Sequence, residues 1–179
     1  RTNLTDTSLI VTWCTEFSGI VKTVAKGALR PKSPFVGVLD LFFTSEIVWV
    51  PSKKSDLHTL TEAKLNDPRL GIRRNYLQTV AAGYFCNCLS KCAETNTPVP
   101  ELYDLLRRAL DFLATDDITP RAIHHFEHQL AIQLGLASSE PNNAAPPAQR
   151  ILSLLRDHLS SIPQQRKELE NRLEISPNH

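Results

Sequence analysis

The period of the hydrophobic pattern changes near Asp67-Pro68, and this change divides the chain into two kinds of structure. In the first part, short apolar stretches alternate with polar residues and are separated by turn residues, which is typical of short β-strands. After Pro68, apolar residues recur at helical spacing. The sequence therefore predicts an α+β protein, with a small β-domain over residues 1–66 and an all-α helical bundle domain over residues 67–179.

Five strand-like stretches occupy the first part of the chain. They are Leu9–Cys14, Ile20–Lys26, Val38–Phe43, Glu46–Val50 and Leu57–Thr61. Short strands in this number, in a domain of this size, predict an OB-type barrel rather than a β-sandwich. The chain begins at Arg1 and contains no Met. We therefore expect that a short N-terminal piece is missing and that the first strand of the barrel is incomplete.

Prolines mark the expected starts of four helices, because proline is favoured at the first position of a helix. The four are Pro68, Pro100, Pro120 and Pro163. Thr119 is a suitable N-cap for the helix that follows it. Two polar segments complete the second domain: a loop between Gly135 and Ala148, and a solvated charged helix at "KELENRLE", residues 167–174.

Charge is unevenly distributed along the chain, although the formal net charge is only +1. Residues 1–80 contain 11 Lys and Arg against 7 Asp and Glu, whereas residues 81–179 contain 9 against 12. The basic first part suggests a polyanionic partner. No apolar run reaches the roughly 18 residues of a membrane-spanning helix, and no secretory leader stands at the start. We therefore expect a soluble cytoplasmic protein with no membrane partner.

The four cysteines are predicted to be reduced, small buried side chains. Cys86, Cys88 and Cys92 fall in a helix-like stretch, where Cys88 and Cys92 share the apolar face and Cys86 points elsewhere. Cys14 falls in a strand-like stretch. A metal site and a disulfide framework are the alternatives, and this spacing favours neither of them.

One catalytic pattern occurs literally. His124-His125-Phe126-Glu127-His128 reads H-x-x-E-H, which is typical of inverted zinc proteases. On a helix, His124 and His128 share a face, as two zinc ligands must, but a third ligand is not evident. We therefore favour histidines that flank a buried apolar stripe. No other hydrolase or nucleotide-binding motif occurs, so the chain is predicted not to be an enzyme and to hold no metal or cofactor. A metallohydrolase is the remaining enzymatic alternative.

The segment "VAKGALRPKSP", which begins at Val24, concentrates positive charge around a glycine and two prolines. Lys22, Val24 and Lys26 share one face of an extended strand, with the two lysines about 13 Å apart. Arg30 and Lys32 continue the charge into a loop stiffened by proline. Such a row of cations can follow a phosphate backbone, and a solubilising surface is the alternative. Weaker candidates for phosphate contacts are Lys53, Lys54, Arg73 and Arg74.

The same part of the chain resembles a known family. "VKTVAKGALRPKSPFVGVLDLF" is similar to the RecO family of bacterial DNA repair proteins in three landmarks: a lysine-glycine step, a basic loop with a Lys-Ser pair, and a "G-x-L-x-x-F"-like strand. Here they are Lys26-Gly27, Arg30-Pro31-Lys32-Ser33, and Gly37, Leu39 and Phe42. Four further stretches resemble the family in the same order: "DLHTLTEAKL", "ELYDLLRRALDFL", "FEHQLAIQLGL" and "RILSLLRDHL". The resemblance spans nearly the whole chain.

The resemblance implies a recombination mediator, which has an N-terminal OB fold and a helical domain and is not an enzyme. Such a protein binds single- and double-stranded DNA, anneals complementary strands, contacts the C-terminal tail of single-strand binding protein, and works with RecR to load RecA. It is expected in the bacterial cytoplasm, at the nucleoid. Many members carry a four-cysteine zinc module after the leucine-glycine helix. Residues 137–148 occupy that place here and contain no cysteine, so zinc is not expected.

The predicted site residues follow from these two lines of reasoning. The residues expected to contact DNA phosphates are Lys22, Lys26, Arg30, Lys32, Ser33, Arg73 and Arg74. Phe35, Phe42 and Phe43 are candidate stacking platforms, with Phe42 predicted to be core. From the resemblance, the helical domain is expected to take an acidic peptide in an apolar groove, with Arg107, Arg108 or Arg121 binding its carboxylate. The rival hypothesis is a module that docks replication or repair proteins and does not bind DNA.

Overall fold

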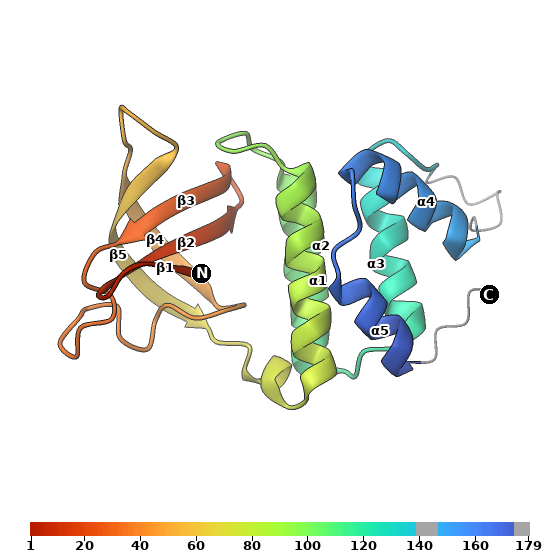
Figure 1. Ribbon diagram of the computed structural model, residues 1–179, viewed down its shortest axis with the longest axis horizontal. Coiled ribbons are helices and arrows are strands. Elements are labelled where there is room, and N and C mark those ends of the chain that lie inside the picture. Colours follow the sequence, from red (N-terminus) through yellow and green to blue (C-terminus); the bar gives the residue numbers. More distant parts are fainter. Residues whose placement is uncertain (139–146, 174–179) are drawn as a thin grey trace. The chain divides into compact units, whose positions relative to one another are not determined.

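The computed structural model describes residues 1–138 and 147–173 of the chain. Their contacts define two compact units. The first unit is Arg1–Arg69 together with Glu94–Pro100, and the five strands lie in it (Figure 1). The second unit lies within Leu70–Ala93 and Glu101–His179 and is helical. The predicted α+β class is confirmed. No helix among the described residues is both long enough and apolar enough to cross a membrane.

The first unit is a five-stranded sheet in the order β1-β2-β3-β5-β4 (Figure 1). The strands are β1 Thr2–Thr5, β2 Ser8–Thr15, β3 Gly19–Ala25, β4 Thr44–Val50 and β5 Leu57–Asp67. β3 and β5 pair in parallel, and the other neighbouring strands are antiparallel. Within the described residues β1 and β4 are the two edges, so the sheet is not closed. Partly open barrels of five strands are typical of the OB fold.

The core of the sheet is built from side chains that alternate along the strands. Leu9 of β2, Ala25 of β3 and Leu60 of β5 belong to one buried cluster. Trp13 packs against this cluster, and its indole N–H donates to the hydroxyl of Thr23 at 2.8 Å. The polar end of the tryptophan is therefore satisfied while its ring fills the interior.

One strand prediction is wrong, and one strand is missed. Val38–Phe43 forms turns, because Gly37 and Phe42 adopt φ angles of 76° and 67°, which a β-strand does not allow. No strand was expected at Thr2–Thr5, where β1 pairs with β2 through Thr2 and Ile10. The other four strand-like stretches lie at β2, β3, β4 and β5.

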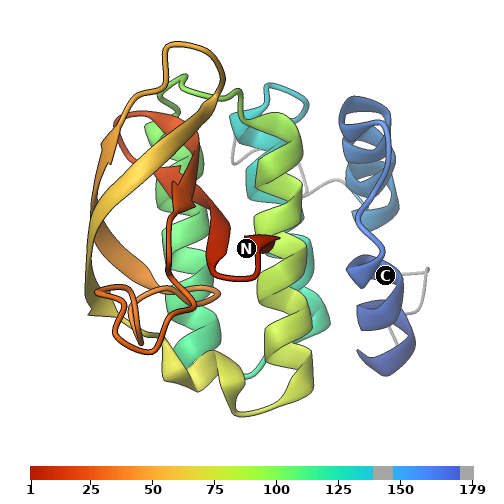
Figure 2. The ribbon, with the colours of Figure 1, turned by 60° about the vertical axis from the view of Figure 1, so that its left-hand side comes forward.

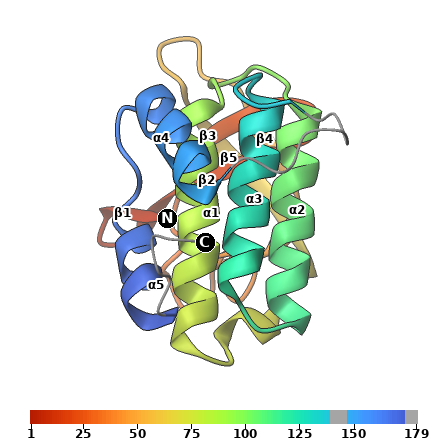
Figure 3. The ribbon, with the colours of Figure 1, turned by 90° about the vertical axis from the view of Figure 1, so that its right-hand side faces the viewer.

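Five α-helices follow among the described residues (Figure 3). They are α1 Tyr76–Cys92, α2 Pro100–Thr115, α3 Pro120–Gln133, α4 Ala148–Leu159 and α5 Gln165–Leu173. The starts predicted at Pro100 and Pro120 are confirmed, and the Thr119 hydroxyl caps α3 by accepting from Ala122 N at 3.2 Å. The loop predicted between Gly135 and Ala148 falls largely on residues 139–146, which lie outside the described residues.

Two of the proline-based helix starts are wrong in position. After Pro68 comes a short 3-10 helix, Leu70–Arg73, and α1 begins only at Tyr76, where the Asn75 side chain accepts from Gln78 N at 3.0 Å. Arg69 has a φ of 41°, which interrupts any helix from Pro68. α5 begins two residues after Pro163, whose carbonyl accepts from Arg166 N at 3.0 Å.

A buried ion pair joins three helices of the second unit. Arg166 of α5 is 4% exposed, and Glu127 of α3 is fully buried. The Arg166 guanidinium donates to a Glu127 carboxylate oxygen, and the Tyr84 hydroxyl of α1 donates to the same oxygen at 2.7 Å. Leu169 is also fully buried. The helix predicted from "KELENRLE" is therefore not solvated all round, because one of its faces packs into the bundle.

Replacing Arg166 by Ala is expected to lower the free energy of unfolding by about 3–5 kcal/mol, because Glu127 would keep a buried charge without its partner. Lys167→Ala on the exposed side of the same helix should change it by less than about 0.5 kcal/mol. Urea unfolding followed by circular dichroism measures both values. Similar losses for the two variants would contradict a structural role for the pair.

Candidate nucleic-acid interface

The connection between β3 and β4, residues 26–43, is a series of turns and is called the basic loop (Figure 2). The amides of Arg30, Ser33 and Val36 each donate to the carbonyl three residues earlier, at 3.0, 3.0 and 3.2 Å. Pro31 and Pro34 have no backbone N–H that could donate to a neighbouring strand, and proline is common in turns. Both ribbon views place this loop at the end of the sheet away from the β4–β5 connection (Figures 1 and 2).

Three apolar side chains of the basic loop are buried in the core of the sheet. Ala28, Phe35 and Leu39 are each 7% exposed and belong to the same cluster as Leu9. Burial of a Phe or Leu side chain stabilises such a conformation by about 1.5–3 kcal/mol. Leu29 N also donates to the carbonyl of Thr7 at 3.0 Å. The loop is therefore fixed to the sheet although it has no regular secondary structure.

The cations of the basic loop lie on its outer side. Lys26, Arg30 and Lys32 are exposed, and within the described part of the chain none of them forms an ion pair. The Arg30 side chain passes close to Gly27, where an added Cβ would lie 3.4 Å from Arg30 Cδ. Gly27 itself has a φ of 67°, which favours glycine at this turn. Phosphate oxygens would thus compete only with water for these three charges.

Lys22 lies on β3 and is the one exposed residue of that strand. Its neighbours on the adjacent strands are Thr12 and Leu57. Val24, which shares its side of the strand, is only 7% exposed. The row predicted from Lys22 to Lys26 is therefore interrupted by a buried valine.

The other three residues predicted to contact phosphate have partners or lie elsewhere. The Ser33 hydroxyl accepts from Phe35 N at 3.2 Å, which holds a turn of the loop and leaves its O–H proton as a donor. Arg73 and Arg74 are exposed residues of the helical unit. Arg74 donates to Gly71 O at 3.2 Å and lies 3.9 Å from an Asp117 carboxylate oxygen.

Two of the three arginines predicted to bind a peptide carboxylate are already paired. Arg107 and Arg108 donate to the two oxygens of Asp104, both at 2.7 Å, and Arg107 also lies 3.1 Å from Asp111. The hydrogen bond from Arg107, supported by Arg108, lowers the pKa of Asp104. Arg121 is exposed at the start of α3 and forms no ion pair within the described residues.

The aromatic side chains are distributed differently from the prediction. Phe35 is the buried one, whereas Phe42 and Phe43 are half-buried. Phe17, in the turn between β2 and β3, is 80% exposed, and sequence reasoning missed it. Thr15 braces that turn, because its hydroxyl donates to Gly19 O at 2.9 Å and accepts from Ser18 N at 3.1 Å. Phe17 could have been identified from the sequence as an aromatic residue in the short turn between two predicted strands.

The H-x-x-E-H pattern does not form a metal site among the described residues. The Glu127 carboxylate is held by Arg166 and Tyr84 inside the bundle, so it cannot serve as a base in an open cleft. Burial lowers the pKa of His124, while the buried Nε2 of His128 has no hydrogen-bond partner within residues 1–138 and 147–173. These positions agree with histidines that flank a buried stripe.

The fold and the site define a two-part protein: an open OB-type sheet with an exposed basic loop, and a helical unit. Residues 1–69 match the sequence model described as "Recombination protein O N terminal", and residues 73–145 match "Recombination protein O C terminal". The chain therefore belongs to the recombination protein O (RecO) family.

Similar curated proteins carry the name "DNA repair protein RecO". The chain is 31% identical to that of Rhodopirellula baltica over 133 residues, which cover 74% of this chain and 49% of the relative. It is 34% identical to that of Idiomarina loihiensis over 140 residues, 76% of this chain and 58% of the relative. It is 36% identical to that of Actinobacillus pleuropneumoniae serotype 7 over 140 residues, 75% and 55%. The chain spans about half the length of these relatives.

The four cysteines are free thiols. Burial raises the pKa of Cys14 to about 11 and that of Cys88 to about 12. Cys88 is fully buried, whereas Cys86 and Cys92 are half-buried, as expected from the apolar face of the helix except that Cys92 is only partly covered. Thiolates, which are both the nucleophiles and the metal ligands, are therefore rare at Cys14 and Cys88.

In a Cys86→Ala/Cys92→Ala variant, the two remaining thiols should react with an aromatic disulfide reagent at pH 8 at least about 100-fold more slowly than after unfolding in guanidinium. The reason is that a pKa of about 11 or 12 leaves far less thiolate than the roughly 8.5 of a free cysteine. Stopped-flow absorbance measures both rates. Equal rates in the folded and unfolded protein would contradict the burial of these thiols.

Proposed function

We propose that this chain binds DNA through the basic loop and acts as a mediator in DNA repair and recombination. The observation that carries the proposal is that the loop buries Ala28, Phe35 and Leu39 while it leaves Lys26, Arg30 and Lys32 exposed and without ion pairs among the described residues. Membership of a family named for recombination and repair supports it.

The chemistry of such a contact is mainly electrostatic. Each lysine or arginine that neutralises a phosphate releases a condensed counterion, which supplies affinity without reading sequence. The loop backbone is held by turns and by buried side chains, so the cations are positioned before DNA arrives. Lys22 extends the surface along β3, and the Ser33 O–H can add a neutral hydrogen bond to a phosphate oxygen.

The rival function is a protein-docking module that does not bind DNA. Its support is the exposed apolar side chains of the same loop, Leu29, Val36 and Leu41, at 47%, 59% and 45% exposure. Salt separates the two hypotheses, because phosphate contacts weaken steeply with ionic strength and apolar contacts do not. We favour DNA because the three loop cations have no carboxylate to satisfy them within the described residues.

The proposal includes the specific activities of a recombination mediator. They are binding of both single- and double-stranded DNA, annealing of complementary strands, and loading of RecA together with RecR on DNA covered by single-strand binding protein. A non-enzymatic role and a location in the cytoplasm at the nucleoid also remain predictions. The names of the relatives describe repair proteins and no catalysed reaction.

Lys26→Glu/Arg30→Glu should weaken the binding of a labelled single strand by at least about 100-fold at low salt. Lys22, Lys26, Arg30 and Lys32 together should contribute about −3 to the slope of log affinity against log salt, at about −0.7 for each contact, and the variant should lose about half of this. Fluorescence anisotropy over a salt series measures both. Stability should change by less than about 0.5 kcal/mol, because the two side chains are exposed.

Lys53→Glu/Lys54→Glu is the matched control, since it makes the same change in net charge at exposed lysines on the β4–β5 connection. Equal weakening by both double variants would mean diffuse attraction rather than a site at the basic loop. If neither variant matters and the protein stays folded, the sheet does not bind DNA through this loop.

For the tail of single-strand binding protein, Arg121 is the favoured contact of the three arginines, because Asp104 already holds Arg107 and Arg108. Arg121→Ala should weaken the binding of an acidic, phenylalanine-ended peptide by about 5- to 30-fold, which corresponds to the loss of one charged hydrogen bond worth about 1–2 kcal/mol. Calorimetric titration measures it, with Arg108→Ala as the control. A larger effect at Arg108 would reverse the assignment.

A further inference from the structure

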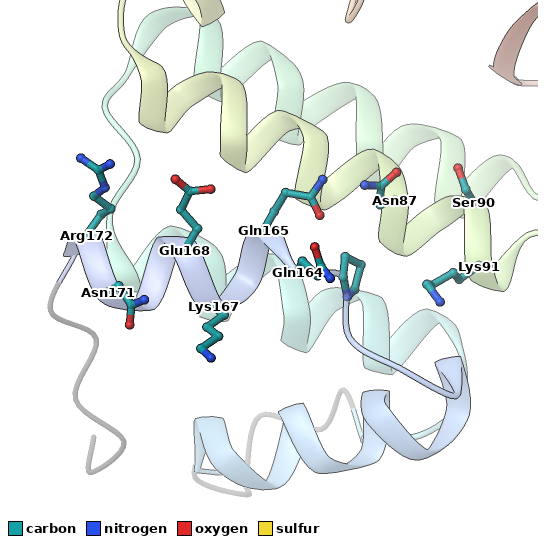
Figure 4. A pocket seen from close by; sticks show the side chains of 10 residues that line it. Asn87, Ser90, Lys91, Gln164, Gln165, Lys167, Glu168, Asn171 and Arg172 are labelled. Atoms are coloured by element: carbon teal, nitrogen blue, oxygen red, sulfur yellow. The ribbon is translucent and has the colours of Figure 1, made fainter. Parts of the chain in front are cut away.

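A groove of about 1010 Å³ lies in the helical unit, between the C-terminal half of α1 and the helix α5 (Figure 4). Pro163 is the one residue of its described lining without a polar side chain. Gln165 and Glu168 point from α5 toward α1, whereas Lys167 projects away from α1 along the rim (Figure 4). The groove is therefore open and polar, and it lies outside the unit that holds the basic loop.

Positive charge predominates in this groove. Lys91 of α1 and Lys167 and Arg172 of α5 line it, against the single carboxylate of Glu168. That carboxylate accepts a hydrogen bond from the Tyr76 hydroxyl at 2.8 Å. Among the described residues none of the three cations forms an ion pair. The groove thus offers uncompensated cations to an anionic ligand.

Two of the cations are held in place before any ligand arrives. Lys91 Nζ donates to the Ser161 hydroxyl at 2.9 Å, and the Arg172 guanidinium carbon lies 5.8 Å from the centre of the Tyr76 ring. α5 itself is anchored by the buried pair of Arg166 with Glu127. The cost of ordering these side chains on binding is correspondingly reduced.

We propose that this groove is a second nucleic-acid-binding surface, which takes the sugar-phosphate backbone of a single strand. The inference rests on the proposed function, which it extends to the helical unit. Its lining combines lysine, arginine, serine and carboxamide side chains, the types that contact phosphate and sugar in protein–DNA interfaces. An acidic peptide is disfavoured, because peptide-binding grooves hold apolar anchor residues and this lining offers only Pro163 for them.

The groove also extends beyond the part of the chain that the family comparison covers. The two matches to the recombination protein O family end at residue 145, whereas α5 begins at Gln165. Seven of the ten residues that line the groove, including Lys167 and Arg172, thus belong to a segment outside these matches.

The test measures anisotropy of a fluorescein-labelled oligothymidylate over a salt series. With three groove contacts added to the four of the basic loop, the slope of log affinity against log salt should be about −5 rather than −3. Lys167→Glu/Arg172→Glu should weaken binding by at least about 10-fold and reduce the slope by about 1.4, from about 0.7 for each contact. Lys167→Gln/Arg172→Gln should reduce the slope in the same way. This variant replaces the first one if the first one does not fold.

Arg150→Glu/Arg156→Glu is the matched control, because both arginines are exposed on α4 of the same unit and do not line the groove. Weakening by the control equal to that by the groove variants would overturn the proposal, as would a wild-type slope near −3 with unchanged binding by the groove variants. The proposal would also be overturned if the groove variants lost the binding of an acidic peptide but kept the binding of oligothymidylate. These outcomes leave the basic loop intact, whereas a wild-type protein that binds no oligothymidylate would end the proposed function itself.

Discussion

The burial of three side chains of the basic loop is the constraint on which the candidate interface depends. Residues 26–43 contain prolines, glycines and several cations. They form turns, which lack the regular backbone hydrogen bonds of a strand or a helix. Ala28, Phe35 and Leu39 supply the missing order by entering the core of the sheet. The polar neighbours of these buried groups lie on the outside, because burying a charged group without a partner costs free energy. The exposed cations follow from the same packing.

The buried pair of Arg166 and Glu127 has the corresponding role in the helical unit. A buried ion pair adds little net stability compared with apolar packing, because both charges must leave water. It does penalise any arrangement in which one partner is buried alone. α5 therefore has one favourable rotation about its axis, with Arg166 and Leu169 inward and Lys167 outward. This interaction also explains the H-x-x-E-H pattern, whose glutamate is a structural partner of an arginine 39 residues away.

Local signals predicted much of the fold from the sequence, and distant partners account for the failures. The change of period, the turn residues and the prolines at 100 and 120 act within a few residues, so they located four strands and two helix starts correctly. The strand at Val38–Phe43 failed because Phe35 and Leu39 are drawn into a core that the local pattern does not contain. The helix start at Pro68 failed for a similar reason. Arg69 is buried, and its guanidinium donates to the Phe42 carbonyl at 3.1 Å, which holds the chain in an irregular path.

The lysines and arginines of the loop could be recognised in the sequence, but the sequence could not tell which cations have partners. Arg107 and Arg108 are neutralised by Asp104 three and four residues away, and this pairing was visible in the sequence as helical spacing. The Tyr76 hydrogen bond to Glu168 joins residues 92 positions apart, and so does not follow from spacing. For that reason the groove lined by Glu168 was not predicted.

A net charge of +1 gives this chain little long-range attraction for a polyanion, so any affinity for DNA has to come from local groups of unpaired cations. Among the described residues, the two groups that we propose for this role are the basic loop in one unit and the groove beside α5 in the other. Under these two proposals, each surface would bind DNA by releasing counterions locally, so the contributions of the two surfaces to the salt dependence would add.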